Sequence, residues 1–199
     1  MKVGIVNYNV GNLASVYNAF QKIGVNATIE TDPEKLKNYD KILLPGVGAF
    51  GSAIEHLKET GMDKAVLEFS QSGKYMLGIC LGMQLLFEES EEFGNHKGLS
   101  LINGKVKRFK EMNLKIPHMG WNRVHHTDNK TLFKGLKDPY LYFVHSYYVE
   151  TKEEFVLGKT EYGIEFTSSV NRENIFGFQP HPEKSHENGL KILRNFSEL

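Results

Sequence analysis

The 199-residue sequence has little cysteine, no excess of either charge and no long apolar run. Its single cysteine, Cys80, excludes an intramolecular disulfide framework and fits a reducing compartment. Lys plus Arg number 24, as do Asp plus Glu, which argues against nucleic acid or an anionic membrane as the main partner. No apolar run approaches the roughly 18 residues of a membrane span. The N-terminus turns polar too early for a signal peptide, so we expect a cytoplasmic protein.

What is present indicates an ordered globular chain. Hydrophobic residues make up 40% of the sequence, and the 19 glycines suit a fold with many tight turns. The length corresponds to one domain at about 150 residues per domain. There is no internal repeat, low-complexity tract or linker rich in Pro, Gly and Ser. We therefore expect residues 1–199 to form a single domain.

In the first half of the chain, short apolar runs alternate with amphipathic stretches. The apolar runs predict strands at residues 3–6, 27–29, 41–44 and 75–79. Helical spacing runs from Leu13 to Ile23, with Gly24 as its stop, and recurs at residues 65–69 and through Leu85 and Leu86. This alternation predicts an α/β fold with a mainly parallel central sheet and helices on both faces.

The second half is richer in β-branched and aromatic residues. Four closely spaced segments, residues 140–149, 155–160, 164–170 and 175–178, predict β-hairpins that extend the sheet or form a small second one. A final helix is expected from about Ser185, with Leu190, Leu193 and Phe196 on its apolar side.

The segment around Cys80 has the form of a nucleophile elbow. Gly78 and Gly82 flank the cysteine at two positions on either side, where the sharp turn from strand to helix leaves no room for a Cβ atom. The turn sets the sulfur at a helix N-terminus, which favours a thiolate. A lone cysteine after apolar residues is equally well read as a small buried hydrophobe. A nearby base would decide between the two.

His181 is the candidate base, and Glu183 is its candidate orienting acid. If the segment is extended, the two side chains point to the same side, so the carboxylate can accept a hydrogen bond from one imidazole nitrogen. The flanking prolines restrict the backbone. Taken alone, a histidine followed by an acid is a weak signal. With Cys80 it forms a prospective catalytic triad of nucleophile, base and orienting group.

Residues 46–51 match the pattern G-x-G-x-x-G and follow a predicted strand. A dinucleotide site would also want an acid at the end of the next strand, but the candidate, Glu68, falls inside a helical pattern. The same glycines can instead form an oxyanion hole with donors from Gly46, Val47 and Gly48, joined by the N–H of Leu81. A nucleotide-binding module remains the alternative of another class.

The acidic run at residues 88–92 is expected to end a helix, where negative charge opposes the helix dipole. An anionic end to a pocket would suit a substrate that carries an ammonium group. No metal site is expected, because His125 and His126 are adjacent rather than four residues apart and one cysteine cannot build a multi-cysteine zinc site.

Four segments together resemble the class I glutamine amidotransferases. They are Pro45 to Gly48, Gly78 to Gln84, His181 to Lys184 and Pro117 to Asn122. The resemblance covers essentially the whole chain, which would make it a single glutamine amidotransferase domain. It implies that Cys80 attacks the side-chain amide of L-glutamine, that His181 passes a proton to the leaving ammonia, and that Glu183 orients His181. No cofactor is implied.

The resemblance also implies the substrate and partner contacts. Positions that match Gln84, Glu92, His145, Ser146 and Tyr147 would hold the glutamine. Ammonia would pass to a separate cyclase subunit with a (β/α)₈ barrel in histidine biosynthesis. Asn12 and residues 117–122 would face that cyclase, although Trp121 by itself is expected to be a core residue.

Two segments depart from the family pattern, and other functions stay open. Pro180 stands where an apolar residue is more usual and removes a strand N–H, and Asn7 to Asn9 stand where an acid often begins the first loop. The alternatives are a stand-alone cysteine hydrolase of the γ-glutamyl peptidase type and the glutaminase subunit of a different synthase.

Overall fold

The centre of the molecule is a parallel sheet of five strands in the order β2-β1-β3-β4-β14. This computed structural model describes residues 1–110 and 113–199. Every residue of β1, β3, β4 and β14 is buried, as the continuous apolar runs predict. The five strands are β1 (Val3–Val6), β2 (Ala27–Glu30), β3 (Lys41–Leu44), β4 (Met76–Ile79) and β14 (Ile175–Phe178).

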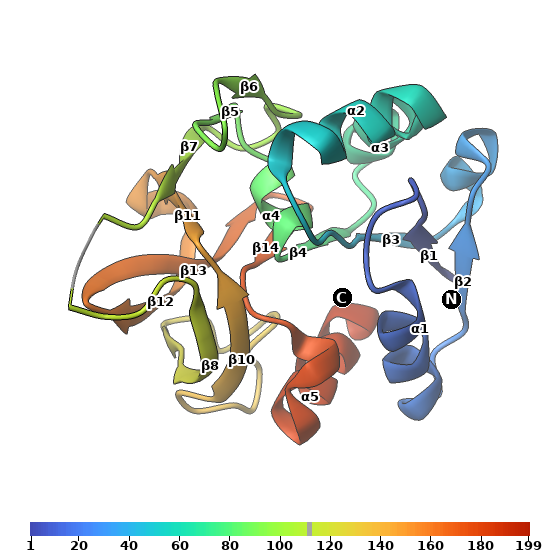
Figure 1. Cartoon of the computed structure of the whole chain (residues 1–199). Helices are drawn as coiled ribbons and strands as arrows, with labels where there is room; N and C mark the ends of the chain where they lie inside the picture. The colour runs from blue at the N-terminus through green and yellow to red at the C-terminus, as the bar shows by residue number, and fades with distance from the viewer. Residues whose placement is uncertain (111–112) are drawn as a thin grey trace.

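Helices cover both faces of this sheet, as expected (Figure 1). On one face α1 (Leu13–Lys22) and α5 (His186–Glu198) pack into one hydrophobic cluster. On the other, α2 (Phe50–Thr60) and α3 (Met62–Gln71) pack into a second. The sequence analysis predicted no helix over the residues of α2. The short helix α4 (Leu81–Leu85) follows β4 directly.

Beyond β14 the sheet continues with mainly antiparallel strands, which confirms the expected hairpin extension, and only β5 pairs with β7 in parallel among the described strands. Strand β13 pairs with β14, β12 and β11, and β11 pairs with β7. The strands of this part are β5 (Glu89–Ser90), β6 (His96–Lys97), β7 (Gly104–Arg108), β9 (His125–His126), β11 (Tyr147–Thr151), β12 (Val156–Tyr162) and β13 (Ile164–Arg172). Among the described residues there are also three 3₁₀ turns, namely η1 (Pro33–Asn38), η2 (Glu153–Phe155) and η3 (Pro182–Lys184).

A separate two-stranded sheet joins β8 (His118–Arg123) to β10 (Tyr140–His145). Residues 140–149, one of the segments from which hairpins were predicted, therefore form two strands in different sheets, and the chain changes sheets at Ser146. This change places residues 145–147 next to the carboxyl ends of β4 and β14, where ligands bind in open α/β sheets.

Candidate active site

Cys80 occupies a strained turn between β4 and α4. Its φ of 54° and ψ of −113° lie outside the regions that L-residues prefer, and its N–H donates to the Phe178 carbonyl at 2.8 Å. A Cβ on Gly78 would lie 2.6 Å from the Gly82 carbonyl oxygen, and a Cβ on Gly82 would collide with the Leu44 carbonyl oxygen. The two glycines are therefore required for this turn, as the sequence predicts.

His181 and Glu183 are joined by a hydrogen bond of 2.8 Å from Nδ1 to Oε1, and both side chains are buried. The backbone is extended at His181 but turns at residues 182–184, which form η3, so the two side chains meet across a turn and not along a strand. The histidine backbone is held on both sides, since its N–H donates to the Tyr142 carbonyl at 2.8 Å and its carbonyl accepts from Ser185 Oγ at 2.6 Å. Pro180 lies after the end of β14, so it removes no bond from the β4–β14 ladder.

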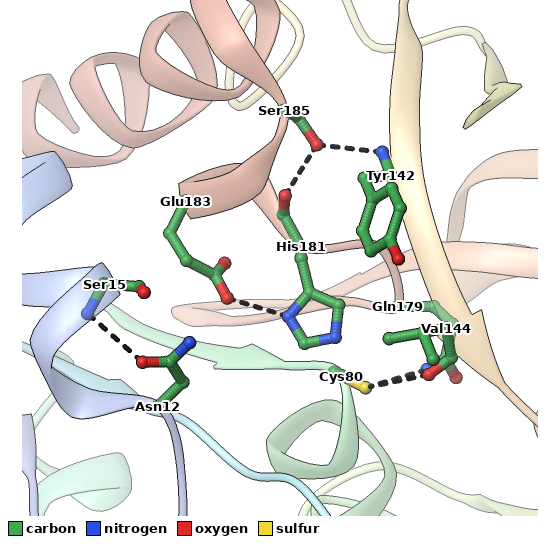
Figure 2. Close-up of polar contacts among 9 residues, drawn as sticks. All are labelled: Asn12, Ser15, Cys80, Tyr142, Val144, Gln179, His181, Glu183 and Ser185. Atoms are coloured by element: carbon green, nitrogen blue, oxygen red, sulfur yellow. Dashed lines mark hydrogen bonds and ion pairs between the residues drawn. The ribbon is translucent and has the colours of Figure 1, made fainter. Parts of the chain in front are cut away.

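The imidazole of His181 faces the Cys80 sulfur, with Glu183 on its other side (Figure 2). Burial opposes the charged ring, but the sulfur and the carboxylate outweigh it and raise the pKa of His181 to about 10. Within the described residues, His181 Nε2 has no hydrogen-bond partner although it is buried. An imidazolium held between a sulfur and a carboxylate is the arrangement of an activated cysteine nucleophile.

Cys80 and His181 line a pocket of about 820 Å³. The pocket is large enough for an amino acid, and it brings together most of the residues that the sequence singled out. Of those residues, the pocket wall includes Val47, Gly48, Cys80, Leu81, Gln84, Glu92, His145, Ser146, Tyr147 and His181. Glu183 stands behind His181, outside the wall.

The glycine loop contributes Val47 and Gly48 to the pocket wall, whereas Gly46 lies outside the wall and allows the close approach of the Gly82 backbone. A Cβ on Gly46 would lie 2.8 Å from the backbone nitrogen of Gly82. Gly48 has a φ of +91°, in the region that favours glycine. The loop leads into α2, and there Glu92 Oε2 already accepts the Phe50 N–H at 2.7 Å. A carboxylate thus occupies the helix N-terminus where a dinucleotide would place its pyrophosphate.

The acidic run does not end a helix, so this expectation is wrong. Helix α4 stops at Leu85, and Glu89 and Ser90 belong to β5. Glu88 accepts from the Gly104 N–H, and Glu91 accepts from the Arg108 N–H, each at 2.8 Å. Glu92 is the acid that turns into the pocket region, and burial raises its pKa despite the Phe50 N–H.

The side-chain nitrogens of His145 and Gln84 form hydrogen bonds within the protein. His145 Nδ1 donates to the Tyr147 carbonyl at 2.8 Å, and its Nε2 pairs with His118 Nδ1 at 2.9 Å. Gln84 Nε2 donates to the same carbonyl at 3.1 Å. Burial lowers the pKa of His145 to about 3, so the ring is neutral near pH 7.

Sequence reasoning missed Gln179 and Arg108, and it placed His118 only in the segment that would face the cyclase. Gln179 is fully buried, and its Nε2 lies 3.7 Å from the Cys80 sulfur. Its position two residues before His181 is the signal that could have identified it. Arg108 lines the pocket from β7, which no sequence pattern predicted. The expectation for Trp121 is wrong, because its side chain is 46% exposed and stacks on His186 with ring centres 5.0 Å apart.

Two general features of the described residues bear on other kinds of site. They contain no group of three or more His, Cys, Asp or Glu side chains that could hold a metal ion. None of the described helices combines the length and the apolar character that a bilayer crossing requires.

Comparison with known proteins extends this result over the whole chain. Residues 5–198 match the family model described as "Glutamine amidotransferase class-I". A protein of Sulfurimonas denitrificans named "Imidazole glycerol phosphate synthase subunit HisH" is 61% identical over 202 residues, covering 98% of this chain and 97% of the relative. A Wolinella succinogenes protein of the same name is 57% identical over 203 residues, covering 99% of each.

Solved structures agree in fold. One described as "Crystal structure of glutamine amidotransferase" has a TM-score of 0.78 at 18% identity, covering 98% of this chain and 97% of the other. "Structure of PurLQS from Thermotoga maritima" has the same TM-score and identity, with 99% and 97% covered. The chain therefore belongs to the class-I glutamine amidotransferase family, together with the relatives named imidazole glycerol phosphate synthase subunit HisH.

Proposed function

We propose that the chain hydrolyses L-glutamine to glutamate and ammonia, as the glutaminase subunit of an imidazole glycerol phosphate synthase in histidine biosynthesis. The observation that carries the proposal is the strained turn that directs Cys80 toward His181, which Glu183 holds by a 2.8 Å hydrogen bond. The names of the full-length relatives support the biosynthetic assignment.

The chemistry follows from the charge on His181. Because the raised pKa keeps the proton on the imidazole, Cys80 attacks the amide carbon as a thiolate. The carbonyl oxygen becomes an oxyanion, for which the Leu81 N–H and the loop of Gly46, Val47 and Gly48 are the candidate donors. His181 then gives its proton to the amide nitrogen, and the carbon–nitrogen bond breaks. Ammonia departs, and a γ-glutamyl thioester remains on Cys80.

The second half returns the enzyme to its starting state. A water molecule attacks the thioester carbon while His181 takes one of its protons. The carbon–sulfur bond breaks, glutamate leaves, and Cys80 is again a thiolate beside an imidazolium. Glu183 orients the ring and stabilises its charge throughout.

Substrate contacts are assigned to the pocket wall. Glu92 is the partner for the α-ammonium group, because it is a carboxylate facing the same pocket as Cys80. Gln84, His145, Ser146 and Tyr147 complete the glutamine site from α4 and the β10–β11 junction. Gln84 and His145 act mainly by shaping the site, since their nitrogens are bonded within the protein.

We further infer a heterodimer with the cyclase subunit, a (β/α)₈ barrel that receives the ammonia through an enclosed channel. Asn12 and residues 117–122 are assigned to that contact. The exposed side chains of Met119 (61%) and Trp121 (46%) on one side of β8 support it, because an interface covers such large apolar groups. The proposal includes a single catalytic domain over residues 1–199 and a cytoplasmic location.

Replacing Cys80 by serine tests the chemistry. Cys80→Ser should lower glutamate release by a factor of about 10³ or more, because a hydroxyl is a far weaker nucleophile than a thiolate. Thermal unfolding should be nearly unchanged. As Cys80 is the chain's one cysteine, iodoacetamide reports on it alone, and glutamine should protect it. A serine variant with wild-type turnover would remove the mechanism.

Adding the cyclase subunit tests the partner. Glutamate release should be low for the isolated chain and should rise when the cyclase binds. Trp121→Ala should weaken this response by at least about tenfold in cyclase affinity, as expected for a buried aromatic anchor. The matched control is Ile29→Ala, an exposed apolar residue (37%) on β2, outside both β8 and the pocket. Equal activity with and without the cyclase would instead favour a stand-alone γ-glutamyl hydrolase.

A further inference from the structure

Four polar groups are linked in a line from β8 toward the pocket. Asn122 Nδ2 lies 3.2 Å from His118 Nε2, and His118 Nδ1 lies 2.9 Å from His145 Nε2. His145 Nδ1 then lies 2.8 Å from the Tyr147 carbonyl oxygen. His118 and His145 are 3% and 6% exposed, so a ring nitrogen that lost its partner could not form a hydrogen bond to water instead. The line runs from the inner side of β8 to the first residue of β11.

Three further contacts continue the line to the sulfur. Gln84 Nε2 donates to the Tyr147 carbonyl at 3.1 Å and to Gln179 Oε1 at 3.0 Å. Gln179 Nε2 lies 3.7 Å from Cys80 Sγ, and Figure 2 shows this amide directed at the sulfur. Gln179 is fully buried, so its amide is not shared with solvent.

One assignment of donors and acceptors satisfies the imidazole part. The Tyr147 carbonyl can only accept, so His145 must carry its proton on Nδ1 and present a lone pair at Nε2. His118 must then carry its proton on Nδ1, which leaves its Nε2 to accept from Asn122. Asn122 cannot be turned over without loss, because its Nδ2 also donates to the Glu161 carbonyl at 2.8 Å and its Oδ1 accepts from the Arg123 N–H.

The amide part is determined in the same way. Both hydrogens of the Gln84 amide nitrogen are used, one on the Tyr147 carbonyl and one on Gln179 Oε1. Gln179 therefore presents its NH₂ group, not its oxygen, to Cys80. A donor at this place stabilises negative charge on the sulfur, whereas an oxygen would repel it.

The surroundings keep both histidines neutral. Burial lowers the pKa of His118 to about 4 and that of His145 to about 3, where the nearby His118 and His181 rings add to the effect. His118 is stacked between Phe143 and Tyr162, with ring centres 4.8 and 4.1 Å away. A second proton on either ring would set two donors against each other, so neutrality preserves the assignment.

We propose that His118, His145, Gln84 and Gln179 form a positioning relay that holds the Gln179 NH₂ group on the Cys80 sulfur. His118 does not line the pocket, so it is a positioning residue that acts through the others. Gln179 is the donor at the reacting atom. The proposal rests on the proposed role of Cys80 as the nucleophile and adds the groups that orient it.

Tautomers provide the first test, which does not depend on turnover. Long-range ¹H–¹⁵N NMR spectra of the full chain at pH 7 should show both His118 and His145 protonated on Nδ1. Assignment uses the spectra of His118→Phe and His145→Phe. A proton on Nε2 of either ring in the wild type would overturn the relay.

Two opposite substitutions at His118 provide the second test. His118→Phe keeps the stack on Phe143 and Tyr162 but has no N–H. His118→Asn keeps a donor near the place of Nδ1 but loses the stack. We expect His118→Phe to lower both kcat for glutamine and the rate of Cys80 alkylation by iodoacetamide about tenfold, the effect of one hydrogen bond, with KM changed less. His118→Asn should stay within about threefold of the wild type on the same grounds. The reverse order, or equal rates, would refute the relay.

Gln179→Met removes the donor at the sulfur without touching β8. It should reproduce the loss seen in His118→Phe, and the double variant should lose little more, because both changes break one chain of contacts. Additive losses would overturn the proposal. If His118→Phe does not fold, Gln179→Met and the tautomers still decide. Wild-type glutamate release tests the proposed function separately from these measurements.

Discussion

Acidification should destabilise this protein through His118 and His145 well before its carboxylates titrate. Both rings have an ordinary pKa of 6.5, and in the folded state these pKa values fall to about 4 and about 3 because the rings are buried. Below pH 6.5 the two histidines therefore become protonated in the unfolded chain but stay neutral in the folded chain. The stabilisation is complete above pH 6.5 and is lost as the pH falls toward the folded-state values.

The size of the effect follows from the shifts. Each pH unit below 6.5 costs about 1.4 kcal/mol per histidine, so at pH 5 the two together lower the free energy of unfolding by about 4 kcal/mol. His181 partly opposes this loss between pH 7 and pH 6, because its raised pKa keeps the folded ring charged while the unfolded ring is still gaining its proton, and it adds little slope below pH 6. Unfolding by urea at pH 7, 6 and 5 measures the total.

Variants separate these two rings from the rest of the protein. His118→Phe removes one of the two titrating groups and keeps the aromatic stack, so its loss between pH 7 and pH 5 should be about 2 kcal/mol smaller than in the wild type. A wild-type stability that stays constant from pH 7 to pH 5, or an equal slope in His118→Phe, would refute the reasoning.

Two further substitutions test the buried charged side chains of Glu92 and Lys41. Glu92→Gln can keep the hydrogen bond from the Phe50 N–H but loses the charge, so KM for glutamine should rise about tenfold or more with kcat nearly unchanged. Glu89→Gln, at the pair with Lys105, is the control and should leave KM unchanged. An unchanged KM in Glu92→Gln would remove Glu92 from the α-ammonium site. Lys41→Met should lower the free energy of unfolding by about 2 kcal/mol, because the buried Lys41 Nζ donates to the Phe196 and Ser197 carbonyls at the end of α5, at 3.1 and 2.7 Å. Lys37→Met, at an exposed ion pair with Glu34, should cost less than about 0.5 kcal/mol in urea unfolding, and equal costs would contradict the assignment.

The parallel half of the sheet was predictable because its signals are local. Strands such as β3 and β4 are continuous apolar runs, and α1 shows helical spacing up to a glycine with a φ of +74°. The elbow at Cys80 was predictable for the same reason, because Gly78 and Gly82, two positions on either side, indicate a turn so tight that a Cβ atom does not fit. Helix α2 also has a local signal, because Phe50, Ala53, Ile54 and Leu57 follow helical spacing, and it was overlooked. Strand β8 has none, because its inward side carries the polar residues His118 and Asn122.

The sequence by itself determined the α/β architecture, the strained turn and the three residues that we propose as nucleophile, base and acid. Only the tertiary structure decided how those groups are held. That Glu92 occupies the start of α2 and that Gln179 donates toward Cys80 both depend on pairing between segments far apart in the chain. Such contacts have no local signal, because the donors and acceptors that satisfy a buried polar group are chosen by packing and not by neighbouring residues.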